Sequence, residues 1–271
     1  MEPWVDGLPA HAVGLADRGL AYGDGVFETV RVSAGQARLL GRHLQRLGEA
    51  TRRLALPLDL ALVEAELTRY AQAMGEGVLK LIITRGDGLR GYAASPEARC
   101  RRILQASPLP AYPEGHARDG VALFPCQTRL AIQPALAGLK HLNRLEQVLA
   151  RAEWQGREEA EGLMRDTEGR VVEGVFSNLF LVNGQRLRTA SLGRCGVAGT
   201  LRAELLAQAP GQGLVAEVAD LAWADLASAD EVFVCNSVYG IWPVIACSDL
   251  VWPVGAVTRT LQRLVRELLD T

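Results

Sequence analysis

Apolar residues recur along the chain at two different spacings, which predict two kinds of element. Between residues 41 and 56 they stand three or four positions apart, at Leu44, Leu47, Ala50 and Leu54. That spacing places them on one face of a helix. Residues 77–86, GVLKLIITRG, form instead a short and strongly apolar run, which is typical of a core strand. Helical and strand-like segments alternate through the chain, and we therefore expect an α/β (α+β) fold.

The same reasoning predicts the other elements. Further helices are expected at 58–74, after Lys140 to about residue 155, at 196–209 after a glycine-rich turn, and at 257–269. Strands are expected within 17–32 and at 102–106, 121–124, 161–165, 170–173, 177–182, 186–189 and 231–235. The helix after Lys140 should bury one stripe made of Leu142, Leu145, Leu149 and Ala152. Asn183-Gly184 marks a hairpin turn, because this dipeptide tolerates positive φ angles.

A proline-rich segment divides the chain. Residues 107–115, SPLPAYPEG, contain three prolines among nine residues, which is the composition of a linker. We therefore expect an N-terminal α/β domain at 1–108, an interdomain linker at 109–116, and a C-terminal α/β domain at 117–271 that carries Lys140.

Composition excludes several classes of function. A hydrophobic fraction of 49% is ample for a core, and a formal charge of -2 leaves no electrostatic footprint for nucleic acid or an anionic membrane. The five cysteines form no CxxC pair, so neither a zinc site nor a disulfide framework is indicated. No apolar run reaches the roughly 20 residues of a membrane span, and the N-terminus lacks the pattern of a signal peptide. We expect a cytoplasmic protein.

Lysine is scarce, which singles out Lys140. The chain has only two lysines, Lys80 and Lys140, and uses arginine for nearly every other positive charge. An amine can lose its proton and attack a carbonyl, whereas a guanidinium cannot. Lys140 stands directly before a predicted helix in GLKHLNRLEQVLAR, and is the candidate for covalent chemistry. Lys80 interrupts the apolar strand and is expected on an exposed face or edge of a sheet.

Other polar residues complete a possible site. Glu173 supplies a carboxylate, and the glycine-rich turn before Thr200 leaves free amides at a helix N-terminus, which suits an anion. Arg42, Arg46 and Arg53 are each explained by a solvated helix face, and His43 by a structural role and not a ligand contact. The loop RGDGLRGY at 85–92 either binds a carboxylate or is simply solvated. A pyridoxal phosphate enzyme needs such a set: a lysine for the Schiff base, an acid for the pyridine nitrogen, and amides with an arginine for the phosphate.

Five stretches resemble the fold-type IV pyridoxal phosphate enzymes, in the same order and over nearly the whole chain: YGDGVFETVRV, HLQRL, LKHLNRLEQVLAR, VVEGVFSNLFLV and GVAGTLR. The resemblance implies a D-amino acid aminotransferase-like fold, with the cofactor in a cleft between two α/β domains, and a homodimer. The family includes branched-chain and D-amino acid aminotransferases and 4-amino-4-deoxychorismate lyases. LKHLNRLEQVL and the RGDGLRGY loop look most like the lyases.

The resemblance assigns roles to matching residues. Lys140 corresponds to the Schiff-base lysine and Glu173 to the acid that pairs with the pyridinium nitrogen. Arg46 matches the phosphate-binding arginine, which replaces the solvated-surface interpretation for that residue. Thr200 and Leu201 match the pair whose amides hold the phosphate, although Leu201 stands where the aminotransferases often have threonine, so a hydroxyl contact is lost.

Further residues are assigned more loosely. Asn236 and Ser237 stand where the family often has another phosphate or substrate contact. Asn143 and Arg144 either shape the site near the lysine or are an ordinary helix start. The expected substrate has two carboxylates, and Arg90, Arg85 and Tyr92 are plausible partners for one of them. No metal is expected.

The resemblance implies an enzyme of folate biosynthesis that converts 4-amino-4-deoxychorismate into 4-aminobenzoate and pyruvate. Lys140 is the economical choice for both proton steps, and the sequence leaves the proton donor to the enolpyruvyl group open. The alternative on the same scaffold is an aminotransferase of D-amino or branched-chain amino acids, which would use the same lysine, acid and phosphate site. A third possibility is a non-catalytic α/β binding protein, in which the scarcity of lysine reflects only a GC-rich genome.

Overall fold

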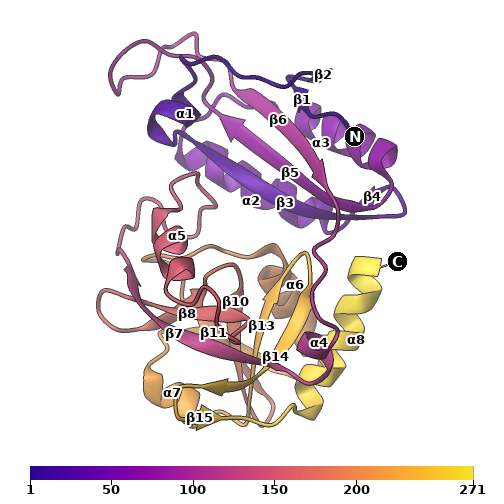
Figure 1. Cartoon of the computed structure of the whole chain (residues 1–271), viewed down its shortest axis with the longest axis vertical. Coiled ribbons are helices and arrows are strands. Elements are labelled where there is room, and N and C mark those ends of the chain that lie inside the picture. The colour runs from indigo at the N-terminus through magenta and orange to yellow at the C-terminus, as the bar shows by residue number, and fades with distance from the viewer. Residues whose placement is uncertain (271) are drawn as a thin grey trace. The chain divides into compact units, whose positions relative to one another are not determined.

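The computed structural model describes residues 1–270, and the chain divides into two compact units (Figure 1). Unit 1 comprises Met1–Pro110, Leu139–Asn143 and the chain end from Leu269. Unit 2 comprises Ala111–Gly138 and Arg144–Leu268. Each unit has its own sheet and its own apolar core.

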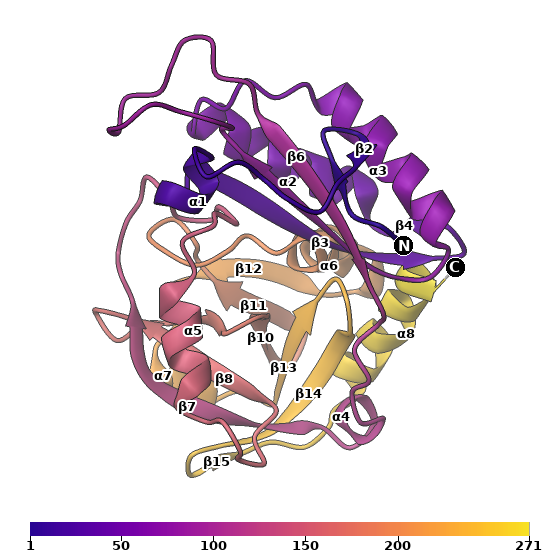
Figure 2. The same cartoon turned by 45° about the horizontal axis from the view of Figure 1, so that its top comes forward.

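Unit 1 is built on an antiparallel sheet of six strands in the order β2-β1-β6-β5-β3-β4. The strands are β1 Trp4–Val5, β2 Leu8–Pro9, β3 Gly25–Ser33, β4 Gln36–Ala37, β5 Gly77–Thr84 and β6 Arg101–Ser107. Its helices are α1 Arg18–Tyr22, α2 Leu40–Arg53 and α3 Leu60–Met74. Helices α2 and α3 cover one face of the sheet (Figures 1 and 2). Leu47 of α2, Leu67 of α3 and Leu81 of β5 are almost fully buried in the core of this unit.

The helix predicted at 41–56 and the strand predicted at 77–86 are confirmed as α2 and β5. Lys80 is exposed on one face of β5, which is a central strand and not an edge. Within residues 17–32 the structure adds the short helix α1, because Asp17 accepts the amides of Gly19 and Leu20 and so caps a helical turn.

The segment Leu139–Asn143 belongs to unit 1, although the residues on both sides of it belong to unit 2. His141 forms an antiparallel bridge with Val26 of β3, Phe27 N–H donates to Lys140 O at 2.9 Å, and Leu139 is 1% exposed. The expectation drawn from the linker placed Lys140 with the C-terminal domain. These pairings join residues more than a hundred positions apart. A domain boundary placed at one point of the sequence therefore cannot assign this segment to unit 1.

Unit 2 is built on a sheet in the order β12-β11-β10-β13-β14-β7-β8-β9, with β15 added beside β14. Because β9 also pairs with β10, the strands from β10 round to β9 form a closed ring. The strands are β7 Val121–Leu130, β8 Glu161–Asp166, β9 Val171–Gly174, β10 Asn178–Asn183, β11 Arg186–Ala190, β12 Val215–Ala219, β13 Glu231–Asn236, β14 Gly240–Cys247 and β15 Leu250–Val251. The helices are α4 Gly115–Arg118, α5 Leu145–Ala152, α6 Thr200–Gln208, a 3₁₀ helix Ala209–Gln212, α7 Trp223–Ala227 and α8 Ala256–Asp270.

The hairpin expected at Asn183-Gly184 is confirmed, since β10 and β11 pair antiparallel around it and Gly184 has φ +55°. Strands β12 and β14 were not predicted. No helix within residues 1–270 combines the length and the apolar character that crossing a membrane requires.

The stripe predicted for the helix after Lys140 is wrong. Leu145 and Leu149 of α5 are 75% and 60% exposed, Ala152 is exposed, and the buried position is Ala150. The helix also ends at Ala152 instead of near residue 155. The spacing correctly indicates an apolar face, but within the described part of the chain nothing covers that face.

Candidate active site

Lys140 is fixed in unit 1 by its backbone and by an aromatic ring. Its carbonyl accepts the N–H of Phe27, and its Nζ lies 4.3 Å from the centroid of the Phe27 ring. The other lysine, Lys80, reaches the same ring at 5.7 Å but is exposed on β5. A cation this close to an aromatic face is attracted to it. Phe27 therefore holds the amine of Lys140 beside the start of β3.

A buried carboxylate, Glu28, organises the basic residues of α2. Arg46 donates from Nε to Glu28 Oε1 at 2.8 Å and from Nη2 to Oε2, and His43 Nδ1 lies 2.6 Å from Oε2. Burial alone would raise the pKa of Glu28, but Arg46 and His43 outweigh it and lower that pKa to about 2. The Arg46 side chain is only 11% exposed, so it is not part of a solvated helix surface.

His43 leaves one ring nitrogen unmatched. Burial lowers the pKa of His43 below its usual value, although Glu28 opposes the shift, so the neutral ring donates its Nδ1 proton to Glu28. Nε2 is then a buried acceptor, and among residues 1–270 it has no hydrogen-bond partner. Buried polar atoms are normally paired. The Nε2 atom beside Arg46 is thus available to accept a hydrogen bond from a group outside the chain.

In unit 2 the carboxylate of Glu173 is buried at the end of β9. Glu173 is 3% exposed, and its Oε2 accepts the N–H of Val197 at 2.8 Å and Asn178 Nδ2 at 3.4 Å. Asn178 Nδ2 also donates to Val197 O at 2.9 Å. At Gly196, φ is +84° and a Cβ would lie 3.2 Å from Glu173 Oε2. The acid is thus held in one orientation against the turn that precedes α6.

The N-terminus of α6 carries no side-chain cap. Its N-cap residue is Gly199, where a Cβ would lie 1.9 Å from Asn178 Oδ1, so any other residue would displace the Asn178 side chain. Thr200 and Leu201 open the helix and are buried. The first amides of a helix lack internal acceptors and carry the positive end of the helix dipole. They can therefore bind an anion such as a phosphate.

Two of the looser assignments lie in the turn between β13 and β14. Asn236 Oδ1 accepts the N–H groups of Val238 and Tyr239 at 2.9 and 3.0 Å, and its Nδ2 donates to Phe176 O at 3.2 Å. Its side chain holds this turn. Ser237 is partly buried beside it, and its contact with a ligand stays a prediction.

Asn143 and Arg144 lie on opposite sides of a unit boundary. Asn143 Nδ2 donates to Gly23 O at 3.2 Å, in the turn that precedes β3. Arg144 is the N-cap residue of α5. Burial lowers the pKa of Arg144, and the carboxylate of Glu173 is the larger of two that partly offset this shift. Arg144 therefore lies within electrostatic range of the buried acid.

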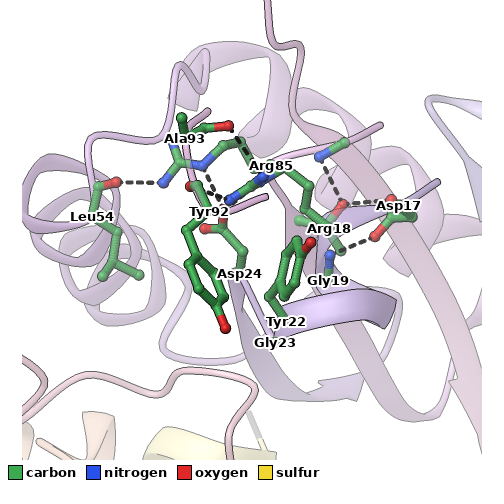
Figure 3. A network of polar contacts seen from close by, with 12 residues as sticks. Asp17, Arg18, Gly19, Tyr22, Gly23, Asp24, Leu54, Arg85, Tyr92 and Ala93 are labelled. Carbon is green, nitrogen blue, oxygen red and sulfur yellow. Dashed lines mark hydrogen bonds and ion pairs between the residues drawn. The ribbon is translucent and has the colours of Figure 1, made fainter. Parts of the chain in front are cut away.

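The structure changes the role of Arg85. Its Nε donates to Asp24 Oδ2 at 2.7 Å, and its Nη1 and Nη2 donate to Ala55 O and Leu54 O, each at 2.8 Å (Figure 3). Every nitrogen of its guanidinium donates to the chain itself, so Arg85 has a structural role, and its contact with a substrate carboxylate stays a prediction. Arg90 is exposed and Tyr92 is 87% exposed, and their substrate contact stays a prediction.

Three residues of these arrangements were missed: Phe27, Glu28 and Asn178. A signal for Glu28 exists in the sequence, because a carboxylate stands between the apolar residues Phe27 and Val30 of strand β3. His43 and Arg46 lie three positions apart, on one face of α2. Asn178 and Phe27 carry no comparable signal, since their roles depend on residues far away along the chain. Among residues 1–270, no cluster of His, Cys, Asp and Glu could hold a metal ion.

This chain belongs to the Amino-transferase class IV family, which matches residues 25–247. It is similar to a solved structure of 4-amino-4-deoxychorismate lyase from Pseudomonas aeruginosa, with 61% identity, a TM-score of 0.97, and 99% of this chain and 100% of that chain covered. It is 37% identical to an aminodeoxychorismate lyase of Vibrio harveyi, over 96% of this chain and 97% of the relative. A putative branched-chain-amino-acid aminotransferase of Methanocaldococcus jannaschii is 29% identical, over 94% and 91%.

Proposed function

We propose that this protein is a pyridoxal phosphate-dependent lyase that converts 4-amino-4-deoxychorismate into 4-aminobenzoate and pyruvate. The observation that carries the proposal is the likeness, over nearly the full length, to the Pseudomonas and Vibrio lyases. The aminotransferase relative shares less of the sequence. Because the aminotransferases use the same lysine, acid and phosphate site, overall similarity separates the two activities better than those residues do.

The residues of the candidate active site fit the cofactor, pyridoxal phosphate. Lys140 would bind its aldehyde carbon, Glu173 would pair with the ring nitrogen, and Arg46 with the amides of Thr200 and Leu201 would hold its phosphate. Three observations support this fit: the orphaned His43 Nε2 beside Arg46, the bare helix N-terminus at Gly199, and the buried carboxylate of Glu173. When bound, the cofactor supplies a carbonyl for the substrate amine and a ring that accepts an electron pair.

The backbone of Gly138, two residues before Lys140, is hydrogen-bonded to the turn that binds Glu173. Gly138 N–H donates to Gly196 O at 2.9 Å, and Ala198 N–H donates to Gly138 O at 3.0 Å. The same turn supplies the Val197 amide that binds Glu173. Lys140 follows Gly138 by two residues, so its Cα lies within about 7 Å of that of Gly138 whatever the arrangement of the units. The backbone of Lys140 and the carboxylate of Glu173 are thereby both linked to one short turn.

Lys140 is the residue that we propose for proton transfer. The reaction breaks a C–H bond at the carbon that carries the amino group and the C–O bond to the enolpyruvyl group, and the leaving group gains a proton as pyruvate forms. The amine of Lys140 can take the first proton, and the ring of Phe27, 4.3 Å away, stabilises the resulting ammonium. The same ammonium can then return the proton to the leaving group.

The experiment that tests this function supplies the purified holoenzyme with 4-amino-4-deoxychorismate generated in situ, without any 2-oxo acid. We expect 4-aminobenzoate and pyruvate in equal amounts, followed by fluorescence and by a coupled assay. Transfer of an amino group from D-alanine or leucine to 2-oxoglutarate, without 4-aminobenzoate, would instead identify an aminotransferase.

We further propose that the protein is a homodimer and works in the cytoplasm. Helix α5 has an apolar face formed by Leu145, Val148 and Leu149, each of which is 60% to 75% exposed. A second copy of the chain would cover this face. The five cysteines are all buried free thiols, a state that reducing compartments preserve.

A further inference from the structure

The loop between β5 and β6 is rich in glycine, yet a buried arginine binds its backbone. Arg18 of α1 is 4% exposed. Its Nη2 donates to Tyr92 O at 2.8 Å, and its Nη1 donates to Gly91 O at 3.0 Å and to Ala93 O at 3.4 Å (Figure 3). One guanidinium thus satisfies three successive carbonyls of a loop that would otherwise face solvent.

Arg18 is itself fixed by Asp24. Its Nε donates to Asp24 Oδ2 at 2.9 Å, and the same oxygen accepts Arg85 Nε at 2.7 Å. Burial opposes the ionisation of Asp24, but Arg85 and Arg18 together hold its pKa below the usual value. The aspartate is therefore an anion that joins two arginines. Arg85 continues the network to the carbonyls of Leu54 and Ala55 at the end of α2.

The loop sequence fits this arrangement. A Cβ at Gly88 would lie 2.7 Å from Arg18 Cδ, so the backbone can pass over the arginine stem only at glycine. Gly91 has φ +105°, and its N–H donates to the Tyr22 hydroxyl at 3.3 Å. The rings of Tyr22 and Tyr92 lie 5.4 Å apart.

We propose that Arg18, held by Asp24, is a positioning residue that fixes loop 88–93 so that Arg90 presents its guanidinium to a carboxylate of the substrate. The loop backbone is tied inward while its side chains project: Leu89 is 86% exposed and Arg90 is exposed. When a glycine-rich loop becomes ordered only on binding, the loss of its conformational entropy lowers the affinity for the ligand. A loop that is already fixed in the free protein does not have this entropy cost. The role of Arg90 rests on the proposed function, whereas the fixing of the loop by Arg18 does not.

Limited proteolysis tests the fixing of the loop. Trypsin cleaves after Arg90 only when this segment opens, so Arg18→Met should be cut there about tenfold faster than the wild type. The cleavage rate of Arg18→Lys should lie between those of the wild type and Arg18→Met, because a lysine can bind only some of the three carbonyls. This variant also provides a test if Arg18→Met folds poorly. The matched control is Arg102→Met, because Arg102 is a half-buried arginine of the same unit that pairs with Glu66 at 2.8 Å and makes no contact with residues 88–93. Equal cleavage rates in the wild type and both Arg18 variants would overturn the proposal.

Kinetics test what the fixed loop does. In Arg18→Met we expect KM for the substrate to rise about tenfold, as in Arg90→Met, with kcat and the visible spectrum of the bound cofactor unchanged. The double variant should be no worse than Arg90→Met, since Arg18 acts through Arg90. Additive losses would show that Arg18 acts elsewhere and would overturn its positioning role. Absence of lyase activity in the wild type would overturn the proposed function and the role of Arg90 with it, while the trypsin comparison would still decide whether Arg18 fixes the loop.

Discussion

Glu28 of β3 binds Arg46 of α2 through both carboxylate oxygens, with Arg46 Nε 2.8 Å from Oε1. The strand that pairs with the Lys140 segment therefore also sets the position of the proposed phosphate-binding cation. A paired, planar guanidinium of this kind has little freedom to turn.

Replacing Glu28 by Gln should weaken both the fold and the cofactor site. The change leaves Arg46 buried without its counter-ion, which costs about 3 kcal/mol in similar buried pairs. We expect a lower free energy of unfolding in urea and weaker binding of pyridoxal phosphate, measured by quenching of protein fluorescence. Glu49→Gln is the control, because Glu49 pairs with Arg52 on the exposed side of the same helix. A variant as stable as the control would contradict this account.

Glu161 should make the stability fall as pH rises. It is fully buried and accepts hydrogen bonds from the amides of Gly162, Val175 and Phe176 and from Ser177 Oγ. Burial outweighs these bonds and raises its pKa from an ordinary 4.5 to about 8. Between these values the folded state keeps a proton that the unfolded state has lost, so the free energy of unfolding decreases by up to about 1.4 kcal/mol per pH unit.

Urea denaturation of the wild type and of Glu161→Gln at several pH values between 5 and 8 measures this effect. Glutamine mimics the neutral carboxyl, so the stability of the variant should lack the contribution of Glu161 to the slope. The difference between the two proteins should shift in favour of the variant as pH rises. Two parallel curves would show that Glu161 does not change its proton content on unfolding.

Lys140→Ala should lose the covalent link to the cofactor, and Lys80→Ala should keep it. Reduction with borohydride followed by intact mass measurement detects the link directly. Activity should be abolished in the first variant and close to the wild type in the second, because Lys80 is exposed on β5. A stable cofactor adduct in Lys140→Ala would make Lys80 the reactive amine.

Gly199→Ala should impair phosphate binding without touching the lysine. Its Cβ would lie 1.9 Å from Asn178 Oδ1, so Asn178 must move away from both Val197 and Glu173. We expect the dissociation constant of pyridoxal phosphate to rise at least about tenfold, through loss of hydrogen bonds to charged groups. Gly211→Ala is the matched control in the same unit, because nothing lies within 4 Å of its added Cβ. Equal affinities in the two variants would exclude the turn from the phosphate site.

The apolar face of α5 should be an interface between two copies. Leu145→Asp combined with Leu149→Asp places two charges on that face and should convert a dimer into a monomer, measured by size-exclusion chromatography with light scattering. Val251→Asp, at a 78% exposed position on β15, is the control and should remain dimeric. A dimer of unchanged dissociation constant in the double variant would place the interface elsewhere.

Local patterns predicted local structure well. The spacing of Leu47 and Ala50 gave the buried face of α2, and the apolar run gave β5. For α5 the spacing indicated an apolar face but not what covers it, because a periodic pattern carries no information about the partner. The pairing of Glu28 with Arg46 could not be predicted from local patterns either, since it depends on how a strand and a helix pack together.

The candidate site shows the same division. Glu173 and the turn before Thr200 were proposed from the sequence itself, and the role of Arg46 came from resemblance to a family. The interactions that orient them come from Glu28, Val197 and Asn178, which lie on other segments of the chain. Arg85 illustrates the converse: a glycine-rich loop start indicated an available guanidinium, and the fold uses it internally.

The segment Leu139–Asn143 belongs to unit 1, and this limits how the genes of related proteins can recombine to give a folded chimera. An exchange of unit 1 between relatives by a single crossover at the linker would leave this segment behind, opposite a foreign β3. The pairing of Val26 with His141 and the burial of Leu139 would then have to be matched by chance. A chimera that keeps Lys140 beside its own strand β3 therefore needs two further crossovers, one on each side of the segment.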